Sequence, residues 1–206
     1  MEEVHNERSM NLYELHTTPE QLMGYKNKLK IPKFAWEEYK NQKFEGSTDL
    51  GKFVPAILKD PNTAMSFVEN VIKGPFPEAE KIIATDPQTA HDYANYILHG
   101  RFKLGEPAIM TDPHWASWYA SGILKQRWLE AEKVIATNRR SAYRYAKDVI
   151  KGRFPEAEPE IMTGPNITIK YVDDVIKGRW PEAEKELKQD PFYWNQYQEV
   201  LRKYNR

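Results

Sequence analysis

Apolar and small residues recur along most of this chain at the spacing of helices that bury one face. From residue 61 onward they lie three, four, seven and eight positions apart, which gathers them on one side of an α-helix. The recurring positions are Ala64, Ala90, Ala116 and Ala142; Phe67, Tyr93, Tyr119, Tyr145, Tyr171 and Tyr197; Val68, Ala94, Ala120, Ala146 and Val172; and Val71, Ile97, Ile123, Val149, Val175 and Leu201. The pattern predicts a series of amphipathic helices, and the alanines allow neighbouring helices to approach closely.

A shorter apolar pattern follows each of these helices. An aromatic residue comes first, and an aliphatic residue stands seven positions after it. The pairs are Phe76 and Ile83, Phe102 and Ile109, Trp128 and Ile135, Phe154 and Ile161, and Trp180 and Leu187. We expect a second, shorter helix here, with the aromatic side chain filling the gap between the two helices. The recurring tyrosines and tryptophans are therefore interpreted as core residues rather than ligand-binding residues.

The two patterns repeat together every 26 residues. The segment 149–158 (VIKGRFPEAE) recurs at 71–80 and 175–184, with weaker copies at 97–102 and 123–132. The equivalent stations in the five copies are Gly74, Gly100, Gln126, Gly152 and Gly178. A fixed period of this length is typical of stacked helical repeats.

The residues at the predicted turns agree with this division. A repeat begins at an Asp-Pro pair such as Asp60 and Pro61, where the carboxylate accepts unpaired amide hydrogens and proline suits the first helical position. The glycine station, such as Gly152, is expected to take the left-handed conformation of a helix C-cap. A second helix then begins at a proline such as Pro155, with glutamates in its first turn.

The sequence therefore predicts an all-α fold in which short two-helix repeats stack as a right-handed array resembling an α-solenoid. Residues 1–16 are expected to form a flexible arm, and residues 17–60 irregular N-terminal helices with a degenerate capping repeat. Residues 61–190 hold five repeats of 26 residues, and residues 191–206 a C-terminal capping helix.

Two ladders of charged residues follow the same period. Arginines stand at one station and glutamates at another: Arg101, Arg127, Arg153 and Arg179; Glu80, Glu106, Glu132, Glu158 and Glu184. The ladders are either ion pairs that orient the stack or a ridge that contacts phosphates or an acidic partner. Because both signs repeat, structural pairing is the favoured interpretation, since a phosphate-binding ridge needs arginines without matching acids.

Composition narrows the class of protein. Thirty basic and thirty acidic residues give a net charge of +0, so no overall field attracts nucleic acid or an anionic membrane. The chain has no cysteine, which excludes disulfides and thiol chemistry. Its first residues do not form a secretory signal and no apolar run reaches membrane-spanning length, so we expect a cytoplasmic protein without membrane contact.

No motif for catalysis, a metal or a cofactor is present in the sequence. The histidines form no pair with metal-ligand spacing, and His91 and His99 are expected at the surface. No phosphate loop, dinucleotide fingerprint or nucleophile elbow occurs. The paired glutamates of the repeat are better explained by their place at helix N-termini than by acid–base catalysis. We therefore expect a protein that is not an enzyme and binds no cofactor.

Departures from the repeat are the best indication of function, because the architecture does not require them. By helical angle, Tyr96, Trp115 and Trp118 fall on one outer flank of the longer helices, with His114 and Arg144 nearby. Exposed aromatics beside an arginine are typical of interface hot spots. The alternative is that this flank packs on the N-terminal arm or on a second copy of the chain.

The recurring unit Tyr-Ala-x-x-Val-Ile-Lys-Gly-Arg-(Phe/Trp)-Pro-Glu-Ala-Glu resembles short helical repeats in uncharacterised accessory proteins of tailed bacteriophages. The resemblance covers roughly residues 11–206 and implies a phage protein acting in the cytoplasm of the infected cell. The leading hypothesis is a repeat protein that binds a partner protein, such as a host defence factor. The alternative is a nucleic-acid or nucleotide binder that uses the arginine ladder and Lys26, Lys28, Lys30 and Lys33.

Overall fold

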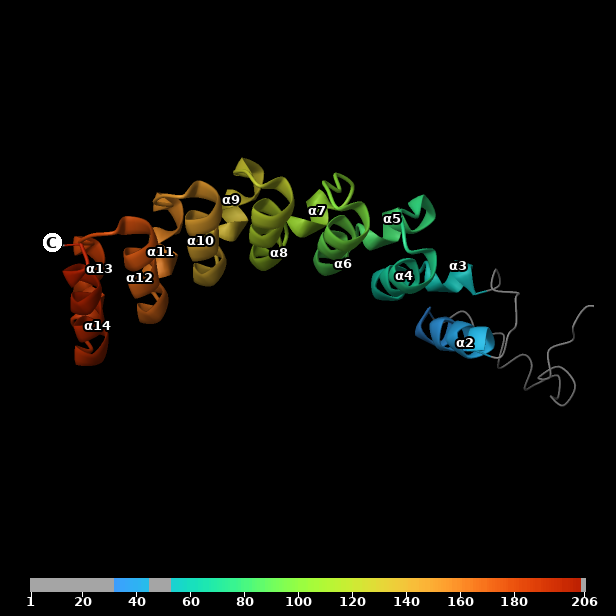
Figure 1. Ribbon diagram of the computed structural model, residues 1–206, viewed down its shortest axis with the longest axis horizontal. Coiled ribbons are helices and arrows are strands. Elements are labelled where there is room, and N and C mark those ends of the chain that lie inside the picture. The colour runs from blue at the N-terminus through green and yellow to red at the C-terminus, as the bar shows by residue number, and fades with distance from the viewer. Residues whose placement is uncertain (1–31, 45–52, 205–206) are drawn as a thin grey trace, which may run out of the picture.

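The protein is an all-α array of helices that follow one another in space in their order along the chain. This computed structural model describes residues 32–44 and 53–204 (Figure 1). The arm predicted for residues 1–16 lies outside these ranges, as do Lys26, Lys28 and Lys30. Within the described ranges every regular element is helical. The predicted all-α repeat array is confirmed, and its handedness stays a prediction.

The longer helix of each repeat, here called the first helix, ends in a wider π-helical turn. The first helices with their π turns are α4 (Pro61–Phe67) with η2 (Val68–Ile72), α6 (Pro87–Asp92) with η3 (Tyr93–Leu98), α8 (Pro113–Trp118) with η4 (Tyr119–Leu124), α10 (Arg139–Tyr145) with η5 (Ala146–Ile150), and α12 (Pro165–Tyr171) with η7 (Val172–Ile176). The stack ends with α14 (Pro191–Arg202), which has no π turn.

The second helices are shorter. They are α5 (Pro77–Ile83), α7 (Glu106–Ile109), α9 (Leu129–Ile135), the 3-10 turn η6 (Pro155–Ala157) with α11 (Glu158–Met162), and α13 (Pro181–Leu187). Ahead of the repeats lie α2 (Pro32–Phe44) and α3 (Val54–Ile57), which pack on each other and on α4 through Ala35, Phe53 and Phe67.

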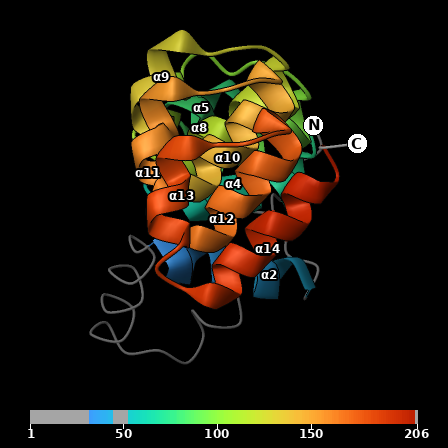
Figure 2. The ribbon, with the colours of Figure 1, turned by 90° about the vertical axis from the view of Figure 1, so that its left-hand side faces the viewer.

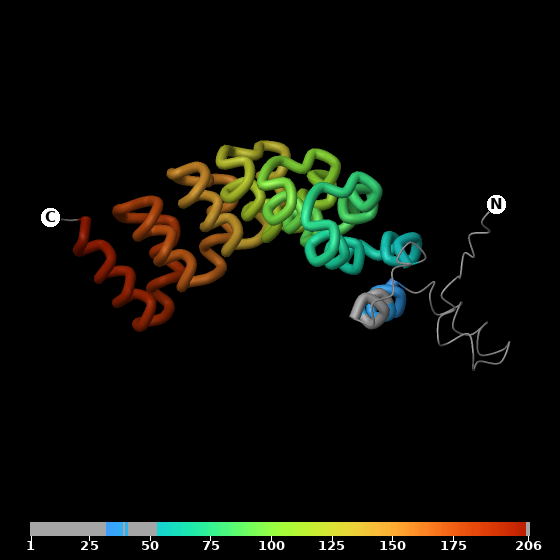
Figure 3. The backbone as a smooth tube through the Cα atoms, turned by 45° about the vertical axis from the view of Figure 1, so that its right-hand side comes forward, coloured from blue at the N-terminus to red at the C-terminus, as the bar shows by residue number. Residues whose placement is uncertain are grey.

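Each first helix packs against its own second helix and against the first helices of the neighbouring repeats. The first helices therefore form one row and the second helices another, which is visible along the stack in Figure 1 and from its C-terminal end in Figure 2. The backbone tube in Figure 3 follows the same progression from α4 to α14. The outer side of the row of first helices is called the first-helix face below.

Side-chain caps explain where the first helices begin. The Asp60 carboxylate accepts a hydrogen bond from the Thr63 backbone N–H at 2.8 Å, and Asp86 caps α6 in the same way. Asp112, Asn138 and Asp190 cap the later helices by the same means. Each cap satisfies amide hydrogens that have no partner inside the helix.

The left-handed residue at the end of each first helix is not the glycine that the sequence predicted. It is the residue before it: Lys73, His99, Lys125, Lys151 and Lys177, with φ between 49° and 58°. In the first repeat the Lys73 N–H donates to the Val68 carbonyl at 2.7 Å, so the π turn closes on the lysine. A Cβ at Gly74 would meet nothing within 4 Å, which explains why the third repeat tolerates Gln126 at this station. Nothing in the structure explains the glycines in the other repeats.

The core runs continuously between the two rows. The tyrosine of each first helix from Tyr93 to Tyr197 is fully buried, and Trp128 and Trp180 are almost fully buried. The rings of Tyr93, Tyr119, Tyr145 and Tyr171 each lie beside the aromatic residue after the next turn, as with Tyr145 and Phe154 at 5.6 Å. The prediction that these repeated aromatics are core residues is confirmed.

Candidate functional site

The repeated arginines and glutamates form one hydrogen-bonded unit that joins adjacent repeats. Arg127 donates two hydrogen bonds to the Glu132 carboxylate, at 2.8 and 2.9 Å. The same carboxylate accepts the Tyr145 hydroxyl of the next repeat at 2.9 Å. That hydroxyl in turn accepts the backbone N–H of Trp128 at 2.7 Å. We call this four-group arrangement the repeat clamp.

The clamp recurs in four copies along the described array. They consist of Arg101, Glu106, Tyr119 and the Phe102 amide; Arg127, Glu132, Tyr145 and the Trp128 amide; Arg153, Glu158, Tyr171 and the Phe154 amide; and Arg179, Glu184, Tyr197 and the Trp180 amide. The first repeat has Pro75 in place of the arginine, and only Glu80, Tyr93 and the Phe76 amide take part.

Protonation equilibria are shifted in the direction that holds the clamp together. Burial raises the pKa of Tyr145 to about 12, and the adjacent Glu132 contributes to the rise. The Arg179 guanidinium lowers the pKa of Glu184 to about 2 against the effect of burial, and Lys188 assists it. The tyrosine therefore stays a neutral donor and the glutamate a charged acceptor across the neutral range.

The pairing in the clamps argues against a phosphate-binding role for the arginine ladder. Each arginine of the ladder is held by a carboxylate five residues later, so the charges along this ridge cancel. Lys33, the remaining basic residue of the alternative hypothesis inside the described ranges, is exposed in a shallow cavity that also holds Glu37 and Asp60. The nucleic-acid hypothesis thus loses the arginine ladder as its support.

The departures from the repeat gather into an aromatic cluster on the first-helix face. The cluster consists of His91, His114, Trp115 and Trp118, whose ring centroids lie 4.5 to 6.1 Å apart in the contacting pairs. The Arg144 guanidinium from the next repeat lies over the Trp118 ring at 4.8 Å, a cation–π contact between α8 and α10.

The members of this cluster differ in burial. Trp115 is half-buried and packs against the hydrophobic core, whereas Trp118 is half-buried without belonging to the core. His114 and Arg144 are exposed. Trp118, His114 and Arg144 are therefore the members that a partner can contact without disturbing the core.

Two of the sequence expectations need adjustment. His91 was expected at the surface but is buried, with its Nδ1 3.0 Å from the Asp92 carboxylate and its ring against Trp115. The expectation is wrong because the tryptophans of the following repeat cover the ring. Tyr96 is 58 % exposed on η3, and no ring contact within the described residues links it to the cluster.

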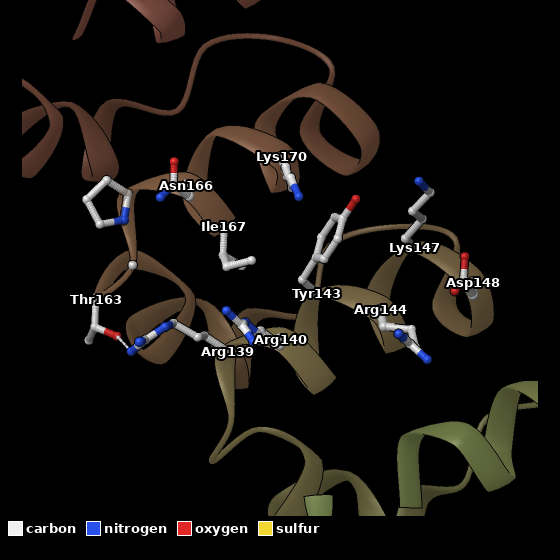
Figure 4. A pocket seen from close by; sticks show the side chains of 12 residues that line it. Arg139, Arg140, Tyr143, Arg144, Lys147, Asp148, Thr163, Asn166, Ile167 and Lys170 are labelled. Atoms are coloured by element: carbon white, nitrogen blue, oxygen red, sulfur yellow. Dashed lines mark hydrogen bonds between the residues drawn. The ribbon is translucent and has the colours of Figure 1, made fainter. Parts of the chain in front are cut away.

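A basic groove adjoins the cluster, between α10 and α12. It has a volume of about 720 Å³, and five cations and one carboxylate line it: Arg139, Arg140, Arg144, Lys147, Lys170 and Asp148. Figure 4 shows Ile167 and Lys170 of α12 facing Tyr143 and Arg140 of α10 across the opening. The groove was missed in the sequence because its two walls come from different repeats.

The cations of the groove fall into two groups. Lys147 pairs with Asp174 at 3.0 Å, and Arg139 lies 3.8 Å from Glu160 and donates to the Thr163 hydroxyl at 3.2 Å. Three other cations are exposed and have no carboxylate within ion-pair distance among residues 32–44 and 53–204. These are Arg140, Arg144 and Lys170. Arg144 thus belongs both to the groove and to the contact with Trp118.

Neither a metal-ligand cluster nor a membrane-spanning helix occurs in the described part of the chain. Its histidines, aspartates and glutamates include no group of three placed to hold a metal ion. None of its helices combines the length and apolar character that crossing a bilayer requires.

Comparison with known proteins adds no family to this description. No protein-family model, curated protein or solved structure matches the chain.

Proposed function

We propose that this chain is a non-enzymatic binding scaffold that holds a partner protein against its first-helix face, with Trp118 and Arg144 at the centre of the contact. The observation that carries the proposal is the cation–π contact between these two residues at 4.8 Å. Tryptophan and arginine are the residues most enriched at interface hot spots, and this contact fixes both side chains before binding.

The repeat architecture does not require these side chains. At the station of Trp118 the neighbouring repeats carry Asp92 and Arg144, and at the station of Trp115 they carry Thr89 and Ser141. Those repeats stack in the same way with polar residues at these stations. The aromatic cluster is therefore a feature added to the array, which supports a role in recognition.

The resemblance of the repeat unit to those of phage accessory proteins favours a partner from an infected bacterial cell. If the chain acts in an infected bacterial cell, a host protein is the natural partner, including a component of a defence system. The identity of the partner depends on this resemblance, whereas the composition of the surface supports protein binding in any cell.

Quantitative affinity purification tests the proposal. The tagged chain and its Trp118→Ala and Arg144→Ala variants are expressed in the infected cells, and captured proteins are measured by mass spectrometry. A partner enriched by the wild type is expected to fall at least roughly ten-fold with either variant. Leu129→Ala is the matched control, because Leu129 is 65 % exposed on a second helix.

Two outcomes contradict the proposal. Equal capture by the wild type and both first-helix variants excludes this surface as the binding site. Loss of capture that accompanies an equal loss of far-UV circular dichroism assigns Trp118 to the fold instead of the interface.

A further inference from the structure

The basic groove between α10 and α12 is lined by more cations than carboxylates. Its three cations without a carboxylate partner come from two repeats, Arg140 and Arg144 from one wall and Lys170 from the other. The chain as a whole has a net charge of +0, so this excess is local. A surface that leaves three cations unpaired beside an apolar side chain, Ile167, is complementary to an acidic ligand.

We infer that the groove binds an extended acidic segment of the partner protein, with carboxylates at alternate positions. The inference rests on the proposed function and names the chemistry of the partner. Arg140 and Arg144 are four residues apart on α10, so their attachment points lie about 6 Å apart along the helix axis. Alternate side chains of an extended chain lie about 6.6 Å apart on one side, which matches this spacing.

Arginine is suited to this role. Its planar group offers several N–H donors in a fork that fits a carboxylate, and its charge does not depend on pH in the neutral range. The contact with Trp118 fixes Arg144 without neutralising its charge. The acidic segment therefore runs beside the aromatic cluster, so that one partner can contact both features.

Nucleic acid fits the groove less well. Binding to a nucleic-acid backbone commonly uses roughly six to ten phosphate contacts, whereas three unpaired cations lie here and the arginine ladder is neutralised by glutamates. A continuous basic stripe along the array would be needed, but the positions equivalent to Arg144 and Lys170 in the other repeats include Asp92, Trp118 and Gln196.

A second copy of the chain also fits less well as the occupant. The exposed glutamates Glu130, Glu156 and Glu182 stand on second helices, one in each repeat. Stacked helices lie about 8–10 Å apart, so glutamates of neighbouring repeats are more widely spaced than Arg140 and Arg144. Glu182 and Glu186 stand four residues apart on α13, but the exposed Lys185 between them would bring a like charge against the groove. An extended segment of another protein reproduces it without rearrangement.

Fluorescence anisotropy of dye-labelled peptides with the full chain tests the inference. The probe alternates glutamate and serine, and its control alternates glutamine and serine. We expect saturable binding of the glutamate peptide that weakens with added salt, and binding of the glutamine peptide weaker by roughly ten-fold or more. The groove variant Arg140→Gln, Arg144→Gln, Lys170→Gln is expected to lose a similar factor.

The matched control variant is Lys81→Gln, Lys133→Gln, Lys185→Gln. It removes the same charge from three exposed, equivalent positions on second helices and is expected to change the affinity by less than about two-fold. Circular dichroism and the melting temperature of each variant show whether it is folded.

Four results overturn the inference. They are the absence of saturable binding of the glutamate peptide, equal weakening by the two triple variants, tighter binding of a single-stranded oligonucleotide that the groove variant abolishes, and self-association of the chain that the groove variant abolishes. If the glutamate peptide fails while capture of a cellular partner still depends on Trp118, the scaffold proposal stands and only the inference about the groove falls.

Discussion

Arginine serves two different purposes in this molecule, in the repeat clamps and in the basic groove. In a clamp, Arg127 donates to the Glu132 carboxylate, which also accepts a hydrogen bond from the Tyr145 hydroxyl of the next repeat. In the groove, Arg140 and Arg144 have no carboxylate partner within the described ranges. The clamps use charge to join repeats, and the groove leaves charge available to a ligand.

This difference shows that the residues near an arginine in the sequence indicate its role better than the fact that it repeats. Every arginine of the ladder has a glutamate five residues later, whereas the fifth residue after Arg140 is Tyr145 and the fifth after Arg144 is Val149. The pairing across the short turn is therefore visible in the sequence. The same rule separates the structural arginines from those of the groove.

The largest expected effect comes from removing a clamp tyrosine. Tyr145→Ala empties a fully buried site between two repeats and removes both hydrogen bonds of the hydroxyl, at a cost of about 3–5 kcal/mol. Tyr145→Phe keeps the ring and is expected to cost about 1–2 kcal/mol. Urea unfolding followed by circular dichroism measures both, and equal losses would show that the hydroxyl alone carries the effect.

A smaller effect with a defined pH dependence is expected from Glu184→Gln. The variant weakens the bonds from Arg179 and Tyr197 and is expected to lower stability at pH 7 by about 1–3 kcal/mol. Because the pKa of Glu184 is lowered in the folded chain to about 2, its stabilisation is present above the unfolded value near 4.5 and is lost as the pH falls toward 2.

The difference in stability between the wild type and Glu184→Gln should therefore shrink over that acid range. Unfolding curves at pH 7, 4 and 2.5 measure it, with Glu182→Gln as the control because Glu182 is exposed and stands outside the clamps. A difference that stays constant with pH would contradict the charged state of the clamp.

A stabilising change of about 1 kcal/mol is expected at the turn that leads to the clamp. Lys125 has φ 53°, a left-handed conformation that costs an ordinary residue free energy and costs glycine little. Lys125→Gly should raise the melting temperature and leave ligand binding unchanged. Lys133→Gly, within α9, is the control and should lower it. A loss of stability with Lys125→Gly would show that the lysine side chain outweighs the backbone strain.

Much of the fold could be predicted from the sequence because the same types of side chain recur at equivalent positions of the repeats. The caps at Asp60 and Asp86 and the buried tyrosines follow from side-chain type and spacing. The place of the left-handed residue could not be predicted, because the π turn shifts the helix end from Gly152 to Lys151. A hydrogen-bond pattern one residue wider than the α-helix leaves no distinct mark in the sequence.

The candidate site was predicted only in part. Helical angle predicted Tyr96, Trp115 and Trp118 on one flank with His114 and Arg144 nearby. The structure brings His114 and Arg144 against the tryptophans, whereas Tyr96 makes no ring contact with them within the described residues. The burial of His91 and the groove between α10 and α12 depend on the approach of adjacent repeats. Reading one helix at a time cannot show such contacts, since the two partners stand about one period apart.

The most direct test of the two roles of arginine compares two double variants of equal charge. Arg127→Gln with Arg153→Gln opens two clamps, and Arg140→Gln with Arg144→Gln removes the two cations of α10 that have no carboxylate partner within the described ranges. For each, the melting temperature and the affinity for the partner or the glutamate peptide are measured. The clamp variant should melt at a lower temperature and keep its affinity, while the groove variant should keep its stability to within about 0.5 kcal/mol and lose its affinity. Equal loss of stability in the two variants, or loss of affinity in a folded clamp variant alone, would contradict the account.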